Sequence, residues 1–267
     1  MHYRTIFISD VHLGARGCKA DELADFLTNN TCDTLYLIGD IVDFWKLHRT
    51  TYFPQSHVKV IQIILEKSES GTKVFFIPGN HDEILRDYVP MKFGNIKMYN
   101  EMIHTCPSGK MLLIIHGDQF DKIMINAKWL MKLGDIGYDI LLRSNNIVHS
   151  IRSMFGYEYW SLSKYLKGKV KGAVQFISKY EGVVSEAVRT RGVDGVVCGH
   201  IHHAEIKDMN GFLYINSGDW VESCTAITED FDGTLTLQRY YPADVAVPVP
   251  EVCDFGSDNQ VLFETLK

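Results

Sequence analysis

Five short clusters of Asp, Asn, His and Gly recur along the chain, and such side chains bind divalent metal ions. The clusters are Asp10-Val11-His12, Gly39-Asp40-Ile41-Val42-Asp43, Gly79-Asn80-His81-Asp82, His116-Gly117-Asp118 and Gly199-His200-Ile201-His202. Imidazole nitrogens combined with carboxylate and amide oxygens, without thiolates, suit Mn, Fe or Zn. Two such ions about 3.5–4 Å apart can hold a hydroxide at neutral pH and stabilise displacement at phosphorus. Together the clusters predict a metal site for chemistry at phosphorus, with Asp40 as the candidate bridging carboxylate.

Each of the five clusters directly follows a short apolar run of strand length. The five runs are Thr5–Ser9, Thr34–Ile38, Lys73–Ile77, Met111–Ile115 and Gly195–Cys198, and a sixth run of the same kind is Phe212–Ile215. Their nearly continuous apolar character predicts strands that are covered on both faces, as in α/β proteins. Helical patterns over Ala20–Asn29 and Val58–Glu69 lie between them. Because α/β sheets bind ligands beyond the carboxyl ends of their strands, the clusters are expected to meet at one edge.

The pattern changes between residues 118 and 191, where apolar residues recur at spacings of three or four, as in Val170, Val174 and Ile177. This periodicity predicts a helical insertion over 118–191. The insertion would divide a core of residues 1–117 and 192–242, and residues 243–267 would form an extended tail. Twelve Lys and Arg residues and six acidic residues lie between Gln119 and Gly192, although the chain carries a net charge of −6. A basic insertion in an acidic body favours an anionic ligand or surface, with a solvated helical face as the alternative.

Composition excludes several classes of protein. The 267 residues are 46% hydrophobic and 22% charged, which is typical of an ordered globular protein. No apolar run approaches the 18 residues that a membrane-spanning helix needs. The chain enters a strand almost at once, without the pattern of a secretory signal, so we expect a cytoplasmic protein. The net negative charge argues against general nucleic-acid binding.

The motifs D-x-H, G-D-x-x-D, G-N-H-D, H-G-D and G-H-x-H, in this order, resemble those of the calcineurin-like metallophosphoesterase family. The resemblance covers residues 5 to about 220, apart from the insertion. It implies an α/β four-layer sandwich, in which two mainly mixed β-sheets are flanked by helices, with a helical cap insertion. It also implies two divalent metal ions, Mn in the first place, with Fe or Zn as alternatives. One ion would be held by Asp10, His12, Asp40 and His202, and the other by Asp40, Asn80, His116 and His200.

The same resemblance implies roles for two further residues. In the family, the residue at the position of His81 faces the substrate phosphate and the leaving oxygen, which suits a general acid. Asp43 would hydrogen-bond the His81 ring and fix its tautomer. A hydroxide between the two metals would attack phosphorus directly, so no covalent phospho-enzyme is expected.

Within the family, the chain resembles the bacterial UDP-2,3-diacylglucosamine diphosphatases of lipid A synthesis. The resemblance rests on Gly39-Asp40 with Trp45 five residues further on, on the His116-Gly117-Asp118 turn, and on the insertion before Gly199. It implies cleavage of a lipid-linked nucleotide, UDP-2,3-diacylglucosamine, to UMP and 2,3-diacylglucosamine 1-phosphate, with peripheral contact to the cytoplasmic face of the inner membrane. His81 is a departure, because the best-known members have Arg there. The expected substrate contacts are Trp45, Asp121, Lys164, Lys167 and Lys171.

Three alternatives remain open from the sequence. The substrate could be a soluble nucleotide or a phosphoprotein, or the basic insertion could serve a nuclease. A metal-holding scaffold without catalysis is a third alternative, which His81 and Asp43 argue against because a scaffold needs no leaving-group acid. We infer no nucleic-acid partner and no obligate protein partner.

Overall fold

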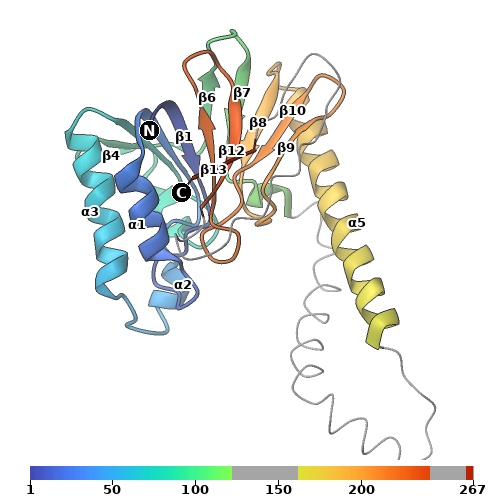
Figure 1. Ribbon diagram of the computed structural model, residues 1–267, viewed down its shortest axis with the longest axis horizontal. Helices are drawn as coiled ribbons and strands as arrows, with labels where there is room; N and C mark the ends of the chain where they lie inside the picture. Colours follow the sequence, from blue (N-terminus) through green and yellow to red (C-terminus); the bar gives the residue numbers. More distant parts are fainter. Residues whose placement is uncertain (122–161, 241–262, 267) are drawn as a thin grey trace, which may run out of the picture. The chain divides into compact units, whose positions relative to one another are not determined.

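The computed structural model describes residues 1–121, 162–240 and 263–266 (Figure 1). The chain divides into two compact units, one formed by Met1–Asp118 with Ser185–Lys267 and the other by Gln119–Val184. Helix α5 (Leu162–Arg189) supplies most of the described part of the second unit. The predicted insertion over 118–191 stays a prediction, because 122–161 lie outside the described residues.

The first unit contains a mixed sheet with the strand order β13-β12-β11-β1-β2-β3-β5-β4 (Figure 1). Strands β1, β2 and β3 run parallel, whereas β11 pairs with β1 in the antiparallel direction. The bounds are β1 (His2–Ile8), β2 (Thr31–Ile38), β3 (Lys73–Ile77), β4 (Met91–Phe93), β5 (Ile96–Met98), β11 (Thr225–Glu229), β12 (Leu235–Tyr240) and β13 (Phe263–Leu266).

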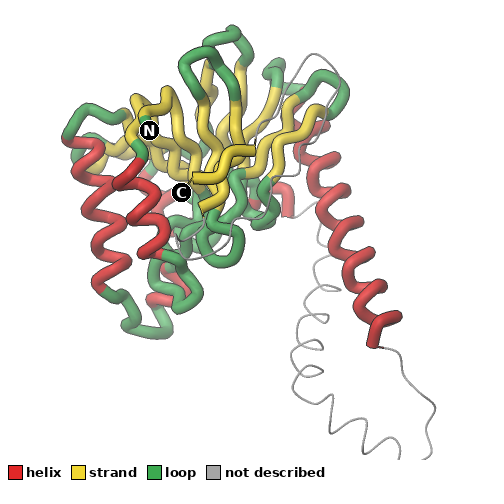
Figure 2. The backbone as a smooth tube through the Cα atoms, viewed as in Figure 1, coloured by secondary structure: helices red, strands yellow, loops and turns green. Residues whose placement is uncertain are grey.

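A second mixed sheet has the order β6-β7-β8-β10-β9 and faces the first (Figure 2). Strands β7, β8 and β10 run parallel, and β6 and β9 are antiparallel at its two edges. The bounds are β6 (Met102–Thr105), β7 (Met111–Ile114), β8 (Gly195–Cys198), β9 (Glu205–Asp208) and β10 (Leu213–Asn216).

Helices α1 (Ala20–Asn29) and α3 (Gln55–Glu69) lie side by side along one face of the first sheet (Figure 1). In α1, Leu23, Phe26 and Leu27 are buried, and their spacing of three and four residues places them on one face. On the second sheet, Arg189 at the end of α5 donates a 2.7 Å hydrogen bond to the carbonyl oxygen of Met209. Two mixed sheets flanked by helices confirm the predicted fold class.

Short helical segments connect the strands near their carboxyl ends. They are α2 (Phe44–Leu47) and the 3₁₀ helices η1 (Glu83–Tyr88) and η2 (Asp118–Phe120). None of the helices in the described ranges combines the length and apolar character needed to cross a bilayer.

Two apolar cores position the strand ends. Side chains alternate along a strand, so Ile6 and Ile8 of β1 pack in the core with α1 and α3. Phe7 points the other way and packs with Ile114 of β7 and Val197 of β8. The second core therefore fixes the first sheet against the second, next to the ends of β1, β7 and β8.

Candidate metal centre

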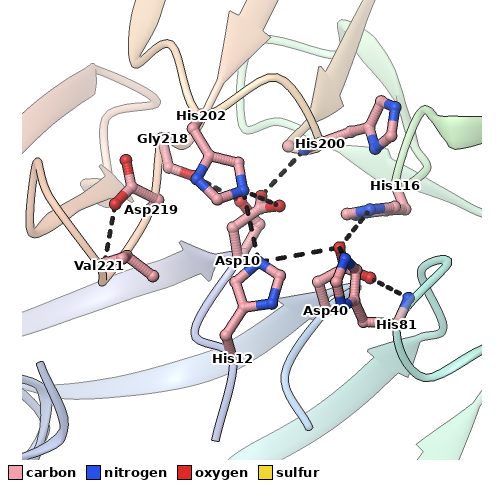
Figure 3. Close-up of polar contacts among 12 residues, drawn as sticks. Asp10, His12, Asp40, His81, His116, His200, His202, Gly218, Asp219 and Val221 are labelled. Carbon is pink, nitrogen blue, oxygen red and sulfur yellow. Dashed lines mark hydrogen bonds and ion pairs between the residues drawn. The ribbon is translucent and has the colours of Figure 1, made fainter. Parts of the chain in front are cut away.

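The predicted metal-binding side chains meet where β1, β2, β3, β7 and β8 end. Figure 3 shows imidazoles of both sheets gathered around the carboxylates of Asp10 and Asp40. The first sheet supplies Asp10, His12, Asp40, Asn80 and His81, and the second supplies His116, His200 and His202. Parallel strand pairs bring these ends together within each sheet.

Five of these residues have a left-handed backbone, which side chains other than glycine rarely adopt. The φ angles are 51° for Asp10, 56° for His12, 54° for Asp40, 71° for His200 and 54° for His202. Such a conformation costs roughly 1–3 kcal/mol per residue and clusters at functional sites. The surrounding fold therefore holds these loops in a strained shape that turns their side chains toward one centre.

Backbone hydrogen bonds between the loops after β1 and β2 hold this shape. The amide of His12 donates to the carbonyl oxygen of Asp40 (2.8 Å), and that of Leu13 donates to Ile41 (2.9 Å). The amide of Asp43 donates to the carbonyl oxygen of Leu13 (2.8 Å). The two loops thus run together beyond the sheet, so His12, Asp40 and Asp43 stay adjacent.

Each carboxylate of the centre uses one oxygen for a backbone amide from another loop. The amide of His200 donates to Asp10 Oδ2 (2.9 Å), and that of His81 donates to Asp40 Oδ1 (2.7 Å). Asp10 and Asp40 are 0% and 2% exposed. Their other oxygens face imidazoles, and Asp10 Oδ1 lies 3.2 Å from His202 Nε2.

Asp40 Oδ2 occupies the middle of the cluster. It lies 3.4 Å from His116 Nε2, 3.9 Å from His12 Nε2 and 4.0 Å from His81 Nε2. An oxygen with imidazoles on several sides has the position that a bridging ligand of a two-metal site requires.

The buried carboxylates raise the pKa of two imidazoles of the centre, His116 and His202. Burial would lower the pKa of His116, but the charges of Asp40 and Asp10 outweigh it and raise the pKa to about 10. The pKa of His202 is raised against burial by its contact with Asp10. Burial would raise the pKa values of Asp10 and Asp40, yet their imidazole partners lower both. Since a metal needs neutral imidazole, ion binding must displace these protons.

The site fits divalent metal ions. Asn80 Oδ1 and His116 Nε2 are buried and make no hydrogen bond to any residue in the described part of the chain. The Nδ1 atom of His116 donates to the carbonyl oxygen of Ile38 (2.9 Å), which directs Nε2 to the centre. Ligand atoms of Asp10, His12 and His202 lie within 4.8 Å of one another, as do those of Asp10, Asp40 and His116. The His200 ring lies beside that of His116, with centroids 5.2 Å apart.

Two motif glycines make room for the carboxylates. A Cβ atom on Gly79 would lie 2.3 Å from Asp40 Oδ1, and one on Gly199 would lie 2.3 Å from Asp10 Oδ2. No side chain fits at either position without displacing a carboxylate of the centre.

His81 and Asp43 lie together at the edge of the centre. The Nδ1 atom of His81 is 3.0 Å from Asp43 Oδ1, and Asp43 is 2% exposed. Burial would raise the pKa of Asp43, but its contacts with the rings of His12 and His81 and the hydrogen bond from the amide of Lys46 lower it. A buried, ionised Asp43 therefore orients the His81 ring. Trp45 covers this ring at a centroid distance of 4.3 Å and is itself 48% exposed.

The sequence motifs contained Asp82 without indicating its role. Asp82 is 0% exposed, and its carboxylate accepts hydrogen bonds from the amides of Ile41 (2.8 Å) and Gly79 (2.5 Å). Burial and the charge of Asp40 raise its pKa to about 6. Asp82 ties the loop after β2 to the loop after β3.

Arg86 is a second residue that the sequence did not single out. Its guanidinium binds both carboxylate oxygens of Asp118, at 2.9 Å and 2.7 Å, and donates to the carbonyl oxygen of Pro78 (2.8 Å). Arg86 thereby joins the loop after β3 to the turn that follows His116.

The remaining predicted residues are placed as follows. Asp121 lies in the second unit, and Lys164, Lys167 and Lys171 lie in α5 with side chains outside the described residues. His203 is exposed, with Nε2 4.0 Å from Glu205 Oε2.

Two mixed sheets with imidazole and carboxylate side chains at their strand ends define a metallophosphoesterase. The sequence model of the calcineurin-like phosphoesterase family matches residues 3–204, so the chain belongs to this family and is a phosphoester hydrolase. This confirms the predicted family and enzyme class.

Among curated proteins, the chain is similar to UDP-2,3-diacylglucosamine hydrolases. It is 26% identical over 236 residues to that of Haemophilus influenzae (strain PittGG), covering 83% of this chain and 92% of the relative. It is 30% identical over 128 residues to that of Porphyromonas gingivalis (strain ATCC BAA-308 / W83), which covers 45% of this chain and 47% of that relative. Among solved structures, a novel archaeal phosphodiesterase is 12% identical, with a TM-score of 0.43 over 88% of this chain and 98% of the other.

Proposed function

We propose that this protein hydrolyses the pyrophosphate bond of UDP-2,3-diacylglucosamine and releases UMP and 2,3-diacylglucosamine 1-phosphate. The observation that carries this proposal is the similarity to hydrolases of that name over most of both chains, 83% of this one and 92% of the Haemophilus influenzae relative. The intact set of imidazole and carboxylate groups at the strand ends supports it.

Two divalent ions complete the proposed site, with Mn as the preferred metal and Fe or Zn as alternatives. Bound there, they would supply a water of lowered pKa and electrostatic stabilisation of the phosphoryl oxygens. One set of ligands is Asp10, His12, Asp40 and His202, and the other is Asp40, Asn80, His116 and His200. Asp40 Oδ2, with three imidazoles within 4.0 Å, supports the shared position.

His81 is the proposed proton donor to the leaving oxygen. Asp43 binds its Nδ1 side, so Nε2 is directed to the centre, where it lies 4.0 Å from Asp40 Oδ2. This orientation lets Nε2 carry the proton that a general acid donates. Trp45 limits the movement of this ring from the solvent side.

The substrate contacts and the cellular location are proposals from the sequence. Trp45, Asp121, Lys164, Lys167 and Lys171 would contact the substrate, since apolar walls suit acyl chains and cations suit phosphates. We place the protein in the cytoplasm, peripherally on the cytoplasmic face of the inner membrane, where such a lipid would be available.

His81 favours a second candidate function. The best-known lipid A enzymes have Arg at this position. An imidazole acid can protonate an alkoxide leaving group, so His81 also suits a phosphodiester such as a soluble nucleotide. Phosphodiesterase or phosphatase activity on a soluble compound is therefore the alternative.

Hydrolysis of UDP-2,3-diacylglucosamine with Mn²⁺, beside an aryl phosphodiester, tests both functions. The Asp40→Ala variant is the blank. UMP release that disappears in this variant would support the lipid substrate, and detergent or lipid should raise the rate. Cleavage of the aryl ester alone would support the proposed metal centre and refute the proposed lipid substrate.

A further inference from the structure

The segment of residues 216–220 runs beside the metal centre, as Figure 3 shows for Gly218 and Asp10. It begins at the end of β10, where Asn216 pairs with Cys198 of β8. Because these two strands are parallel, the segment leaves the sheet at the same edge as the loop after β8. None of its side chains is among the proposed metal ligands, so any effect on the metals passes through other residues.

The side chain of Asn216 is 0% exposed, and both ends of its amide have a partner. Nδ2 donates a 2.7 Å hydrogen bond to the carbonyl oxygen of Gly199. Oδ1 accepts a 3.0 Å hydrogen bond from the amide of Gly218. Because a carbonyl oxygen only accepts and a backbone N–H only donates, these partners fix the orientation of the side-chain amide. Asn216 is therefore a support of the loop after β8.

The peptide between Gly199 and His200 is held at both ends. Its carbonyl oxygen accepts the hydrogen bond from Asn216. Its N–H, which is the amide of His200, donates to Asp10 Oδ2 (2.9 Å). In a planar trans peptide the C=O and the N–H point in opposite directions, so these two hydrogen bonds lie on opposite sides of one rigid group. A rotation of this peptide would weaken both bonds at once.

The turn that begins at this peptide has an unfavourable backbone. The φ angle is 71° at His200 and 54° at His202. Such a conformation persists only where the surrounding contacts impose it. Within the turn, the amide of Ile201 donates to the carbonyl oxygen of Gly199 (2.9 Å). The hydrogen bond from Asn216 reaches the same oxygen from outside and ties the turn to the end of β10.

The same segment also reaches the loop after β1. The carbonyl oxygen of Gly218 accepts a 2.9 Å hydrogen bond from Ser9 Oγ, and Ser9 is 0% exposed. The amide of Trp220 donates to the carbonyl oxygen of Asp10 (3.0 Å). Since β1 belongs to the first sheet and β8 to the second, the segment connects the two halves of the centre.

We propose that Asn216 is a positioning residue of the metal centre, which holds Asp10 and His200 in place through the Gly199–His200 peptide. Asp10 is a proposed ligand of one ion and His200 of the other, so a change at Asn216 should weaken the binding of both. The inference rests on the proposed function for the identity of these ligands. Residues that orient metal ligands typically change metal affinity about 10–100-fold when they are replaced.

The test compares the same substitution at two buried asparagines. In Asn216→Asp, a carboxylate oxygen replaces the donor that faces the carbonyl oxygen of Gly199. Asn30→Asp is the matched control, because Nδ2 of Asn30 donates to the carbonyl oxygen of Phe26 (2.8 Å) and Asn30 is 3% exposed. Asn30 follows α1 and lies outside the metal centre.

Calorimetric titration with Mn²⁺ gives the dissociation constants, and thermal unfolding in EDTA gives the stability of the metal-free proteins. We expect Asn216→Asp to raise the dissociation constants about tenfold or more, which corresponds to about 1.4 kcal/mol or more. Asn30→Asp should leave them unaltered, although both substitutions should lower the melting temperature. Asn216→Ala removes the donor without adding repulsion, so it should give a smaller rise and replaces Asn216→Asp if that variant does not fold.

The absorption spectrum of bound Co²⁺ provides a second readout, because it depends on the geometry of the ligands. At saturating Co²⁺, the visible bands of a folded Asn216 variant should differ from those of the wild type. The bands of Asn30→Asp should coincide with those of the wild type, since a loss of stability alone does not move them.

Two results would overturn the positioning role alone: Mn²⁺ constants within about threefold of the wild type in a folded Asn216 variant, or an equal loss of affinity in Asn30→Asp. A wild-type protein that binds no Mn²⁺ would refute the proposed metal centre and this inference together. Neither measurement uses a substrate, so failure to hydrolyse UDP-2,3-diacylglucosamine would refute the proposed function and leave this test intact.

Discussion

Replacing Gly199 by alanine should disable the metal centre through a single methyl group. The new Cβ atom would lie 2.3 Å from Asp10 Oδ2 and 2.4 Å from Ser9 Oγ. Asp10 and Ser9 are both 0% exposed, so neither can move into solvent. Because carbon and oxygen atoms normally stay more than 3 Å apart, the Asp10 carboxylate must move by about 1 Å.

That movement has two consequences of different size. Ligand distances tolerate only about ±0.2 Å, so Mn²⁺ affinity should fall roughly a hundredfold, or about 2.7 kcal/mol. Overpacking of a buried position should also lower the free energy of unfolding by about 1–3 kcal/mol. The loss of metal affinity is thus expected even where the protein still folds.

Calorimetric titration with Mn²⁺, together with thermal unfolding in EDTA, separates the two effects. Gly182→Ala is the control, because its Cβ would meet nothing within 4 Å in helix α5. This control should keep wild-type affinity and gain about 0.5–1 kcal/mol of stability from the helix. A folded Gly199→Ala protein that binds Mn²⁺ within threefold of the wild type would refute the reasoning.

Three further predictions concern the loops around the centre. His81→Ala should lower the hydrolysis rate about 10²–10⁴-fold at unchanged Mn content per chain, measured by elemental analysis, and a loss of metal would contradict its role as an acid. Arg86→Met should lower the free energy of unfolding in urea by about 1–3 kcal/mol, because it leaves the Asp118 carboxylate without its partner. Adding Asp118→Asn should recover part of that loss, and an equally unstable double variant would argue against this account. Mn²⁺ affinity should rise about tenfold per pH unit between pH 6 and 8, because His116, with a pKa of about 10, must lose a proton to bind the ion. A flat profile in calorimetry at several pH values would show that no such proton is displaced.

The sequence predicted the strands that lead into the motifs, but it missed the inner strands β5, β11 and β12 as well as the edge strands. The runs Lys73–Ile77 and Gly195–Cys198 coincide with β3 and β8, which are paired on both sides and buried on both faces. The edge strands β6 and β9 of the second sheet gave no such signal. An edge strand pairs on one side only and keeps exposed residues, so Glu205–Asp208 reads as a polar loop.

The site was predictable where residue type carries the chemistry. The imidazoles and carboxylates of the five motifs come together as expected. The pair of Arg86 and Asp118 joins positions 32 residues apart, and nothing in either local sequence signals it. The left-handed backbone at Asp10 and His12 was equally hidden, because Asp and His adopt it at only a small minority of positions and the residue type alone does not say which.

The apolar core between the two sheets has a consequence for how this sequence can diverge. Asp10 and Asp40 extend from the first sheet, whereas His116 and His202 extend from the second. The separation of these ligands is therefore set by the side chains packed between the sheets, such as Phe7. A core replacement that shifts one sheet by a few tenths of an ångström can leave the protein folded and still misalign the ligands. Selection for activity thus acts on the buried volume between the sheets as well as on the residues of the centre.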